Sequence, residues 1–110
     1  MSSKVEPTWL GGVRPCKIAD ALSVVGDRWS LLVIREIGEG VHRFNDIRTN
    51  TGAPRQVLAT RLRKLENQRV IERRRYSDHP PRDEYVLTDA GRALRPVLQS
   101  LREWGEQYTS

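Results

Sequence analysis

Apolar side chains recur at steps of three and four residues in several segments of this chain, a pattern that predicts helices. The first segment, residues 16–25, lies between Pro15 and Gly26, residue types that commonly flank short helices. A second helix is predicted over residues 28–37, with Asp27 as a candidate cap. Its expected inward stripe consists of Trp29, Leu32, Val33 and Ile37. The pattern therefore predicts two short, adjacent helices.

Two further helices, joined by a short turn, are predicted in the middle of the chain. The third covers residues 44–49 and is expected to be buried through Phe44 and Ile47. The fourth covers residues 54–68, because Pro54 suits a first helical position, where its missing N–H would have no partner. The inward face of this fourth helix is expected to be formed by Leu58, Leu62 and Leu65. Its outward face is then predicted to consist of Gln56, Thr60, Arg63, Lys64 and Asn67.

The pattern changes to short strands after residue 69. Strands are predicted over residues 70–76 and 84–87, and the turn-forming linker over residues 77–83 is expected to make a protruding tip. Thr88 is predicted to cap a final helix that ends near residue 108. Its apolar stripe comprises Leu94, Val97, Leu98, Leu101, Trp104 and Tyr108. Four helices, a hairpin and a last helix indicate a mainly α fold with a small β-hairpin wing, a winged helix-turn-helix.

Charge adds a candidate function to this fold. The chain has a formal net charge of +5. Residues 55–75 alone have a net charge of +6, from eight basic residues and two acidic ones. The basic residues are Arg55, Arg61, Arg63, Lys64, Arg69, Arg73, Arg74 and Arg75. This concentration is typical of a surface that binds a polyanion such as DNA, although an ordinary solvated basic face is the alternative.

The candidate DNA contacts lie on the fourth helix and on the hairpin. Glutamine pairs with adenine and arginine with guanine, so Gln56 and Arg63 are the expected base readers. The predicted contacts are Arg55, Gln56, Thr60, Arg63 and Lys64 on the helix, and Arg73, Arg75 and Arg82 on the wing. Strand alternation puts Arg74 on the opposite face from Arg73 and Arg75, and one of the three could instead pair with Glu72 or Glu84. Arg82 is favoured most among the wing residues because it lies at the expected tip.

Other classes of protein find little support in the residues. The isolated His42 and His79 and the single Cys16 show no metal-ligand spacing, and no nucleophile elbow or phosphate-binding glycine loop is present. No enzyme activity, cofactor or metal is therefore expected. The sequence shows neither a signal-peptide pattern nor an apolar run of membrane-spanning length, which predicts a cytoplasmic protein. Residues 1–13 are expected to form a flexible lead, and residues 14–108 one DNA-binding domain that includes a C-terminal dimerisation helix.

Four ordered blocks of sequence resemble the HxlR-type transcriptional regulators, relatives of the MarR group. These blocks are CKIADAL leading into VGDRWSLL at residues 16–32, RFNDI at 43–47, QVLATRLRKLE at 56–66 and PPRDEYVLTDAG at 80–91. The resemblance implies a winged helix protein that binds a partly palindromic operator as a homodimer, through terminal helices, and acts as a repressor. The alternative is a protein-interaction module that uses the same fold without reading DNA sequence.

Two more expectations concern the subunit interface and the single thiol. The stripe on the last helix is too apolar for so small a chain to cover, so an interface is predicted at Trp9, Leu10, Leu94, Leu98, Leu101 and Trp104, together with the first helix. Cys16 opens that first helix near Arg14 and Lys17, an environment that favours the thiolate. The resemblance implies a possible sensor of oxidants or electrophiles, since some members of that family use a cysteine at this point, whereas the alternative is an inert packing residue.

Overall fold

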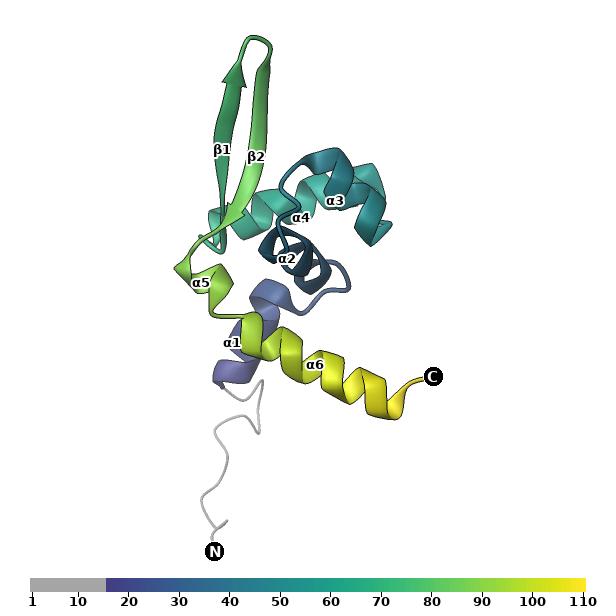
Figure 1. The fold of residues 1–110 in the computed structure, drawn as a ribbon. Helices are drawn as coiled ribbons and strands as arrows, with labels where there is room; N and C mark the ends of the chain where they lie inside the picture. The colour runs from purple at the N-terminus through teal and green to yellow at the C-terminus, as the bar shows by residue number, and fades with distance from the viewer. Residues whose placement is uncertain (1–15) are drawn as a thin grey trace, which may run out of the picture.

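The computed structural model describes residues 16–110, so Trp9 and Leu10 of the predicted interface lie outside the described residues. Figure 1 shows a compact group of helices from which a hairpin projects at one end and the last helix at the other. The elements are α1 (Lys17–Val25), α2 (Ser30–Gly38), α3 (Phe44–Thr51), α4 (Arg55–Asn67), β1 (Ile71–Asp78), β2 (Pro81–Leu87), α5 (Asp89–Arg92) and α6 (Arg95–Tyr108). The predicted fold class, mainly helical with a hairpin wing, is confirmed.

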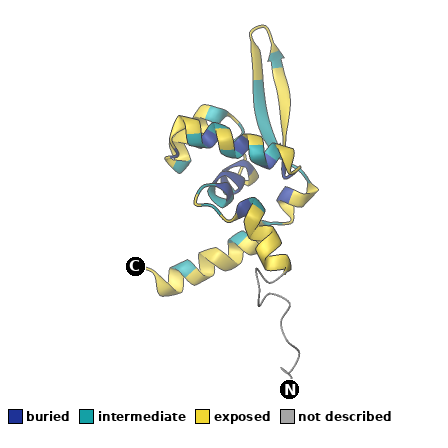
Figure 2. Ribbon diagram, turned by 180° about the vertical axis from the view of Figure 1, so that it is seen from behind, coloured by how far each residue is buried: buried dark blue, intermediate teal, exposed yellow. Residues whose placement is uncertain are grey.

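The core is built around α2, whose buried residues are drawn in dark blue in Figure 2. Ile47 of α3, three leucines of α4 and Ile71 of β1 also belong to it. The predicted stripe of α2 is partly wrong, because Leu32 is only half-buried whereas Ile34 is 1% exposed. The helix begins at Ser30 and not at residue 28, and its buried positions 30, 33, 34 and 37 follow the spacing of one helical face.

Asp27 caps the chain just before α2. Its Oδ2 accepts hydrogen bonds from the amides of Trp29 and Ser30, both at 3.0 Å, and its Oδ1 accepts one from the Ser30 hydroxyl at 2.6 Å. These bonds hold residues 28 and 29 in a turn, which explains why the helix begins later than predicted. Asp27 thus accepts amide hydrogen bonds as a cap would, but it stands two residues before Trp29, which occupies the cap position of α2 without a side-chain hydrogen bond.

A short turn separates α3 from α4. α3 continues to Thr51, two residues beyond its predicted end, and stops at Gly52, whose φ of 77° lies in the left-handed region that suits glycine. Pro54 was predicted as the first residue of the fourth helix, but it occupies the cap position, and α4 begins one residue later at Arg55. Glu36, which is 7% exposed, accepts a hydrogen bond from the Asn50 side chain at 2.8 Å and so connects α2 to α3.

A hydrogen-bonded turn at the end of α4 leads the chain into the hairpin. The amide of Arg69 bonds to Glu66 O at 3.0 Å, and that of Val70 bonds to Leu65 O at 2.9 Å. This pair of bonds is a Schellman motif, which places Arg69 in the left-handed region with a φ of 61°. The buried Val70 and Leu65 provide the hydrophobic contact that accompanies such a motif.

The hairpin is longer than the sequence pattern indicated. β1 and β2 pair from Ile71 opposite Leu87 to Asp78 opposite Pro81, so most of the predicted linker forms part of the ladder. Only Tyr76 is left without an opposite residue, at a bulge between Arg75 and Ser77. The base of the hairpin is held by His42, whose carbonyl accepts from the Tyr85 amide at 2.8 Å and whose ring Nδ1 lies 2.8 Å from Tyr85 O. A carbonyl oxygen only accepts, so the Nδ1–H donates.

The predicted single final helix is divided into α5 and α6. Thr88 caps α5 as expected, with its hydroxyl accepting from the Gly91 amide at 3.2 Å. The helix is interrupted at Ala93 and Leu94 and begins again at Arg95, with Pro96 in the first turn. Proline has no N–H to continue the hydrogen-bond ladder, and its ring disfavours the preceding helical turn. Among the described helices, none combines the length and apolar character required to cross a membrane.

Candidate nucleic-acid interface

One face of α4 is buried and the opposite face is free, as the leucine spacing predicted. Leu58 and Leu65 are 0% exposed and Leu62 is 2% exposed, which fixes the rotation of the helix against the core. Arg55, Gln56, Thr60 and Arg63 are exposed, whereas Lys64 is only half-buried. Within residues 16–110, none of the three cations in this set forms an ion pair. A polyanion would therefore meet unneutralised charge on this face.

The first turn of α4 is organised by its neighbours in α3. The Arg55 guanidinium lies 5.5 Å from the centre of the Phe44 ring, a cation–π distance. The Thr51 hydroxyl donates to Ile47 O at 2.8 Å and lies 3.3 Å from the Ala53 amide, from which it accepts. Thr51 therefore closes the turn between α3 and α4. Ala53 is 2% exposed and belongs to the core.

Arg61 differs from the other basic residues of α4 because it turns toward the protein interior. Its Nε lies 3.3 Å from Asp27 Oδ2, and the two side chains are 29% and 21% exposed. The buried Nε of Arg61 has no hydrogen-bond partner within the described residues, so the contact with Asp27 is chiefly electrostatic. Burial raises the pKa of Asp27, but hydrogen bonds from Ser30 and Trp29, with the Arg61 charge, outweigh burial and leave that pKa below its usual value.

Sequence reasoning placed Arg61 in the basic surface and missed its role in positioning α4. The signal was available in the helical spacing, because Arg61 follows Leu58 by three residues and precedes Leu65 by four. Such a position lies beside the buried stripe of the helix and not opposite to it. The contact of Arg61 with Asp27 joins the start of α2 to the middle of α4, and so helps to set the direction in which the outward face points.

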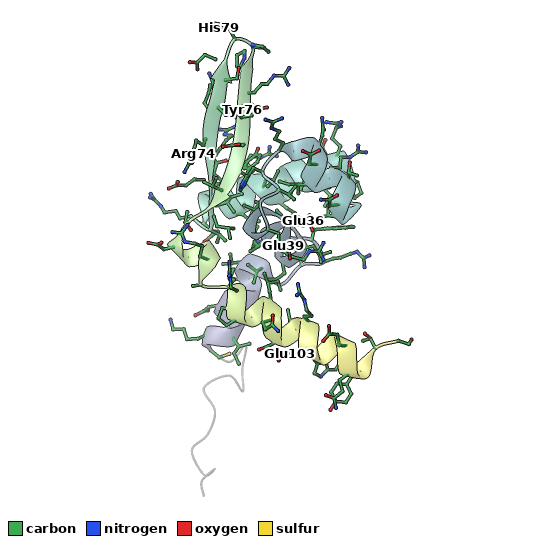
Figure 3. The ribbon with its side chains drawn as sticks, viewed as in Figure 1. Glu36, Glu39, Arg74, Tyr76, His79 and Glu103 are labelled. Carbon is green, nitrogen blue, oxygen red and sulfur yellow. The ribbon has the colours of Figure 1, made fainter. Side chains whose placement is uncertain are left out.

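The wing arginines separate into paired and unpaired ones. Arg73 Nε lies 3.7 Å from Glu66 Oε2, and Arg75 Nε lies 3.3 Å from Asp83 Oδ1. The suggestion that an arginine pairs with Glu72 or Glu84 is wrong, because Arg75 stands directly opposite Asp83 and Arg73 lies on the side of the sheet that reaches α4. Arg74 and Arg82 are exposed and form no ion pair within residues 16–110. Figure 3 shows Arg74 and Tyr76 along the hairpin.

Arg43 is a further cation that the sequence did not single out. It precedes α3, and its guanidinium lies 4.5 Å from the centre of the Tyr76 ring at the bulge. The contact joins the middle of the wing to the start of the helix-turn-helix. No sequence pattern links these two residues, because they are brought together only by the way the hairpin folds back over the helices.

Of the predicted interface residues on α6, two pack against the core and two are exposed. Leu94 and Leu98 are half-buried and pack against the core of their own chain. Leu101 and Trp104 are 51% and 59% exposed, and α1 also exposes apolar side chains. The other large exposed apolar residues of these helices are Ile18, Leu22, Val97 and Tyr108. α1 and α6 therefore present apolar surface that residues 16–110 do not cover.

Cys16 is exposed and stands at the cap position of α1. Its Sγ accepts a hydrogen bond from the amide of Ala19 at 3.2 Å. The first turn of α1 is thus closed by a hydrogen bond to an exposed sulfur. Within the described residues, no group of three histidine, cysteine or carboxylate side chains could hold a metal ion.

A short helix, a tight turn, a longer helix with a basic outward face and a hairpin beside it define a winged helix-turn-helix protein. The HxlR-like helix-turn-helix family model matches residues 24–110, and the chain belongs to this family. It is 44% identical over 91 residues to the HTH-type transcriptional regulator Mb3122 of Mycobacterium bovis. That alignment covers 83% of this chain and 58% of the relative, so the chain spans little more than half of that protein's length.

Solved structures of similar proteins include two whose descriptions concern redox state. The reduced form of the regulator YodB from Bacillus subtilis has a TM-score of 0.73 and 31% identity, with 89% of this chain and 97% of that chain covered. The redox regulator HypR in its oxidized form has a TM-score of 0.79 and 32% identity, with 86% and 99% covered. The described fold is thus similar to that of regulators examined in both reduced and oxidised states.

Proposed function

We propose that this protein is a sequence-specific regulator of transcription that binds double-stranded DNA as a homodimer and acts as a repressor in the cytoplasm. The observation that supports it most directly is the outward face of α4, where cations without an ion pair in residues 16–110 lie beside the amide of Gln56, on a helix packed through its leucines. A helix of this kind fits the major groove, whose width is about 12 Å.

Within this proposal, the contacts have different tasks. Gln56 and Arg63 read base edges, while Arg55, Thr60 and Lys64 hold the helix against the groove and its phosphates. On the wing, Arg82 binds the neighbouring backbone most strongly because it has no carboxylate partner in the described chain. Arg73 and Arg75 contribute less, since Glu66 and Asp83 already neutralise them. Each base-reading pair contributes about 1–3 kcal/mol of discrimination.

The dimer part of the proposal is supported by the apolar faces of α1 and α6. A second copy covers the exposed surface formed by Ile18, Leu22, Leu101 and Trp104. Leu94 and Leu98 instead pack α6 against the core of its own chain. Twofold symmetry would then present two copies of α4 to successive turns of the groove, about 34–36 Å apart. Such spacing matches a partly palindromic operator.

Regulation through Cys16 is the remaining part of the proposal. The thiol is exposed, accepts an amide hydrogen bond and lies on the helix proposed to join the two subunits. Oxidation or alkylation there adds bulk at the interface and changes the spacing of the two reading helices. The structural similarity to the redox regulator HypR supports this assignment.

Enrichment of genomic fragments on the purified full chain, followed by titration of the enriched and of scrambled fragments, tests the proposal. We expect preference for certain fragments and a steep loss of affinity with salt. About eight phosphate contacts per dimer would give a slope of roughly −7 in log K against log salt. Equal affinity for all sequences, or no binding at low salt, would instead support the protein-interaction module.

A further inference from the structure

An open groove of about 1150 Å³ lies between the C-terminal end of α4, the first half of β1 and α5. Its lining includes Arg69 after α4, Arg74 on β1 and Thr88 before α5. Arg63, which belongs to the outward face of α4, also lines it, so the groove continues from that face. The volume exceeds the roughly 300–1,000 Å³ typical of small-molecule sites, which favours an extended ligand.

The charge of this groove is predominantly positive. Its lining contains five arginines and three carboxylates. Glu66 lies 3.7 Å from Arg73, and Asp89 pairs with Arg92. Within residues 16–110, three lining arginines form no ion pair, and only one lining carboxylate, that of Glu72, is left to oppose them. The three arginines are Arg63, Arg69 and Arg74. Such an excess attracts a polyanion.

Arg69 has a backbone conformation that arginine disfavours. Its φ of 61° lies in the left-handed region, at the position of the Schellman motif where glycine is the usual residue. The neighbouring structure imposes this conformation, because the Arg69 amide donates to Glu66 O at 3.0 Å and the Arg69 carbonyl accepts from the Thr88 hydroxyl at 2.7 Å. Backbone strain of this kind is concentrated at functional sites.

The side chain of Arg69 does not account for this strain within the protein. It is exposed, and it forms no ion pair in the part of the chain that the structure describes. Glycine would satisfy the same turn without the steric cost of a Cβ. The arginine therefore supplies something that the turn itself does not need, namely a positive charge beside the outward face of α4.

We propose that Arg69 binds a phosphate of the DNA backbone, with Arg74 as a second contact, and that the groove receives one edge of the duplex. This inference rests on the proposed function and extends its contact surface beyond the outward face of α4 and the tip of the wing. The negative end of α4 is a weak obstacle to an anion here. The carbonyls of Lys64, Leu65 and Glu66 already accept hydrogen bonds from the amides that follow the helix.

A phosphate contact has a distinct thermodynamic signature. Phosphates carry no sequence information, so Arg69 should strengthen binding to every duplex alike. Each neutralised phosphate contributes a slope of about −0.9 in log K against log salt, which is roughly eightfold in affinity at about 0.1 M salt. The proposed dimer has two copies of Arg69, and their combined contribution is then about 60-fold.

Arg69→Gly separates binding from folding. Fluorescence anisotropy with the enriched and the scrambled DNA fragments, across about 0.05–0.3 M salt, should show affinity about 10- to 100-fold lower at 0.1 M for both fragments. The salt slope should change from roughly −7 to about −5. The urea midpoint of the full chain should stay the same or rise, because glycine adopts this conformation freely. A purely structural arginine would not combine unchanged or greater stability with weaker binding.

Three further variants serve as controls. Arg69→Lys keeps the charge and should bind within about threefold of wild type with the same salt slope. Arg69→Gln should reduce the slope as glycine does. Arg95→Gln is its matched control, because Arg95 is exposed, forms no ion pair within residues 16–110 and lies outside the groove lining. It should leave the slope within about 0.5 of wild type.

Several outcomes would overturn the inference. A salt slope that Arg69→Gly leaves unchanged would exclude the phosphate contact while the proposed function stands. Equal losses for Arg69→Gln and Arg95→Gln would show diffuse attraction, and a loss confined to the enriched fragment would make Arg69 a base reader. A lower urea midpoint for Arg69→Gly would make the arginine structural. A wild type that binds neither fragment would refute the proposed function, and this inference with it.

Discussion

Replacing Asp27 with alanine should be one of the most destabilising single changes outside the apolar core. The carboxylate accepts two amide hydrogen bonds and one hydroxyl hydrogen bond at the start of α2, and it also faces Arg61 of α4. Alanine removes all four contacts together. It leaves the Ser30 hydroxyl, which is 0% exposed, without its acceptor.

The magnitude follows from these contacts. Loss of a cap costs about 1 kcal/mol, and an orphaned buried hydroxyl costs roughly 1–3 kcal/mol. The contact with Arg61 adds about 1 kcal/mol or less, because neither side chain is fully buried. We therefore expect a loss of about 3 kcal/mol for Asp27→Ala, equivalent to roughly 10–20 °C in Tm. Asp27→Asn keeps one capping oxygen and should lose only about 1 kcal/mol.

The pH dependence gives an independent check on the charge. The pKa of Asp27 is lowered in the folded state, so its stabilising contribution is present above the ordinary value of 3.8 and is lost as pH falls through the folded value. The difference in stability between wild type and Asp27→Asn should be constant from about pH 8 to 5 and should shrink below about pH 4.

Urea unfolding followed by tryptophan fluorescence, at one fixed protein concentration, provides the measurement. Arg61→Ala and the double variant complete a cycle that should give a coupling of about 0.5–1 kcal/mol. The reasoning is refuted if Asp27→Ala lies within about 0.5 kcal/mol of wild type, or if alanine and asparagine are equally destabilising. A gap that stays constant down to pH 2 would refute the electrostatic part.

Three further predictions concern DNA binding, assembly and the thiol. Arg63→Ala or Gln56→Ala should reduce the preference for the enriched fragment over random DNA by about 1–3 kcal/mol, whereas Arg82→Ala should weaken binding to both DNAs alike. Gel-shift titrations that give uniform losses for all three variants would contradict this division between base readers and backbone contacts. Leu101→Asp should yield monomers or insoluble protein, and a variant that remains dimeric by light scattering would show that α6 lies outside the interface. Peroxide or diamide should release DNA from wild type but not from Cys16→Ser, and identical responses would make Cys16 a packing residue.

Much of the fold was predictable because burial follows a simple period. In α4 the spacing of Leu58, Leu62 and Leu65 predicted which face is buried, and the structure leaves Gln56 and Arg63 exposed on the other. Their contact with DNA stays a prediction. The hairpin was harder, since residues 77–83 are polar on both faces and show no alternation that would distinguish a strand from a loop.

The features that sequence reasoning missed depend on pairs of residues far apart in the chain. No sequence pattern around Arg61 predicts its contact with Asp27, and none around Arg43 predicts its contact with Tyr76. Each pair forms only once the helices and hairpin are packed. The break before α6 is a different case. Pro96 was visible in the sequence, and the strong apolar stripe around it outweighed a local signal that should have ended the helix.

The hairpin has one consequence for how this protein can change over evolutionary time. In β1 only Ile71 is buried, and toward the turn neither strand contributes to the core. The free energy of opening the outer half is therefore small compared with that of unfolding the whole chain, and its amides should exchange early. Substitutions there have little effect on folding, so this segment can diversify at low cost while the helices beneath it stay constrained.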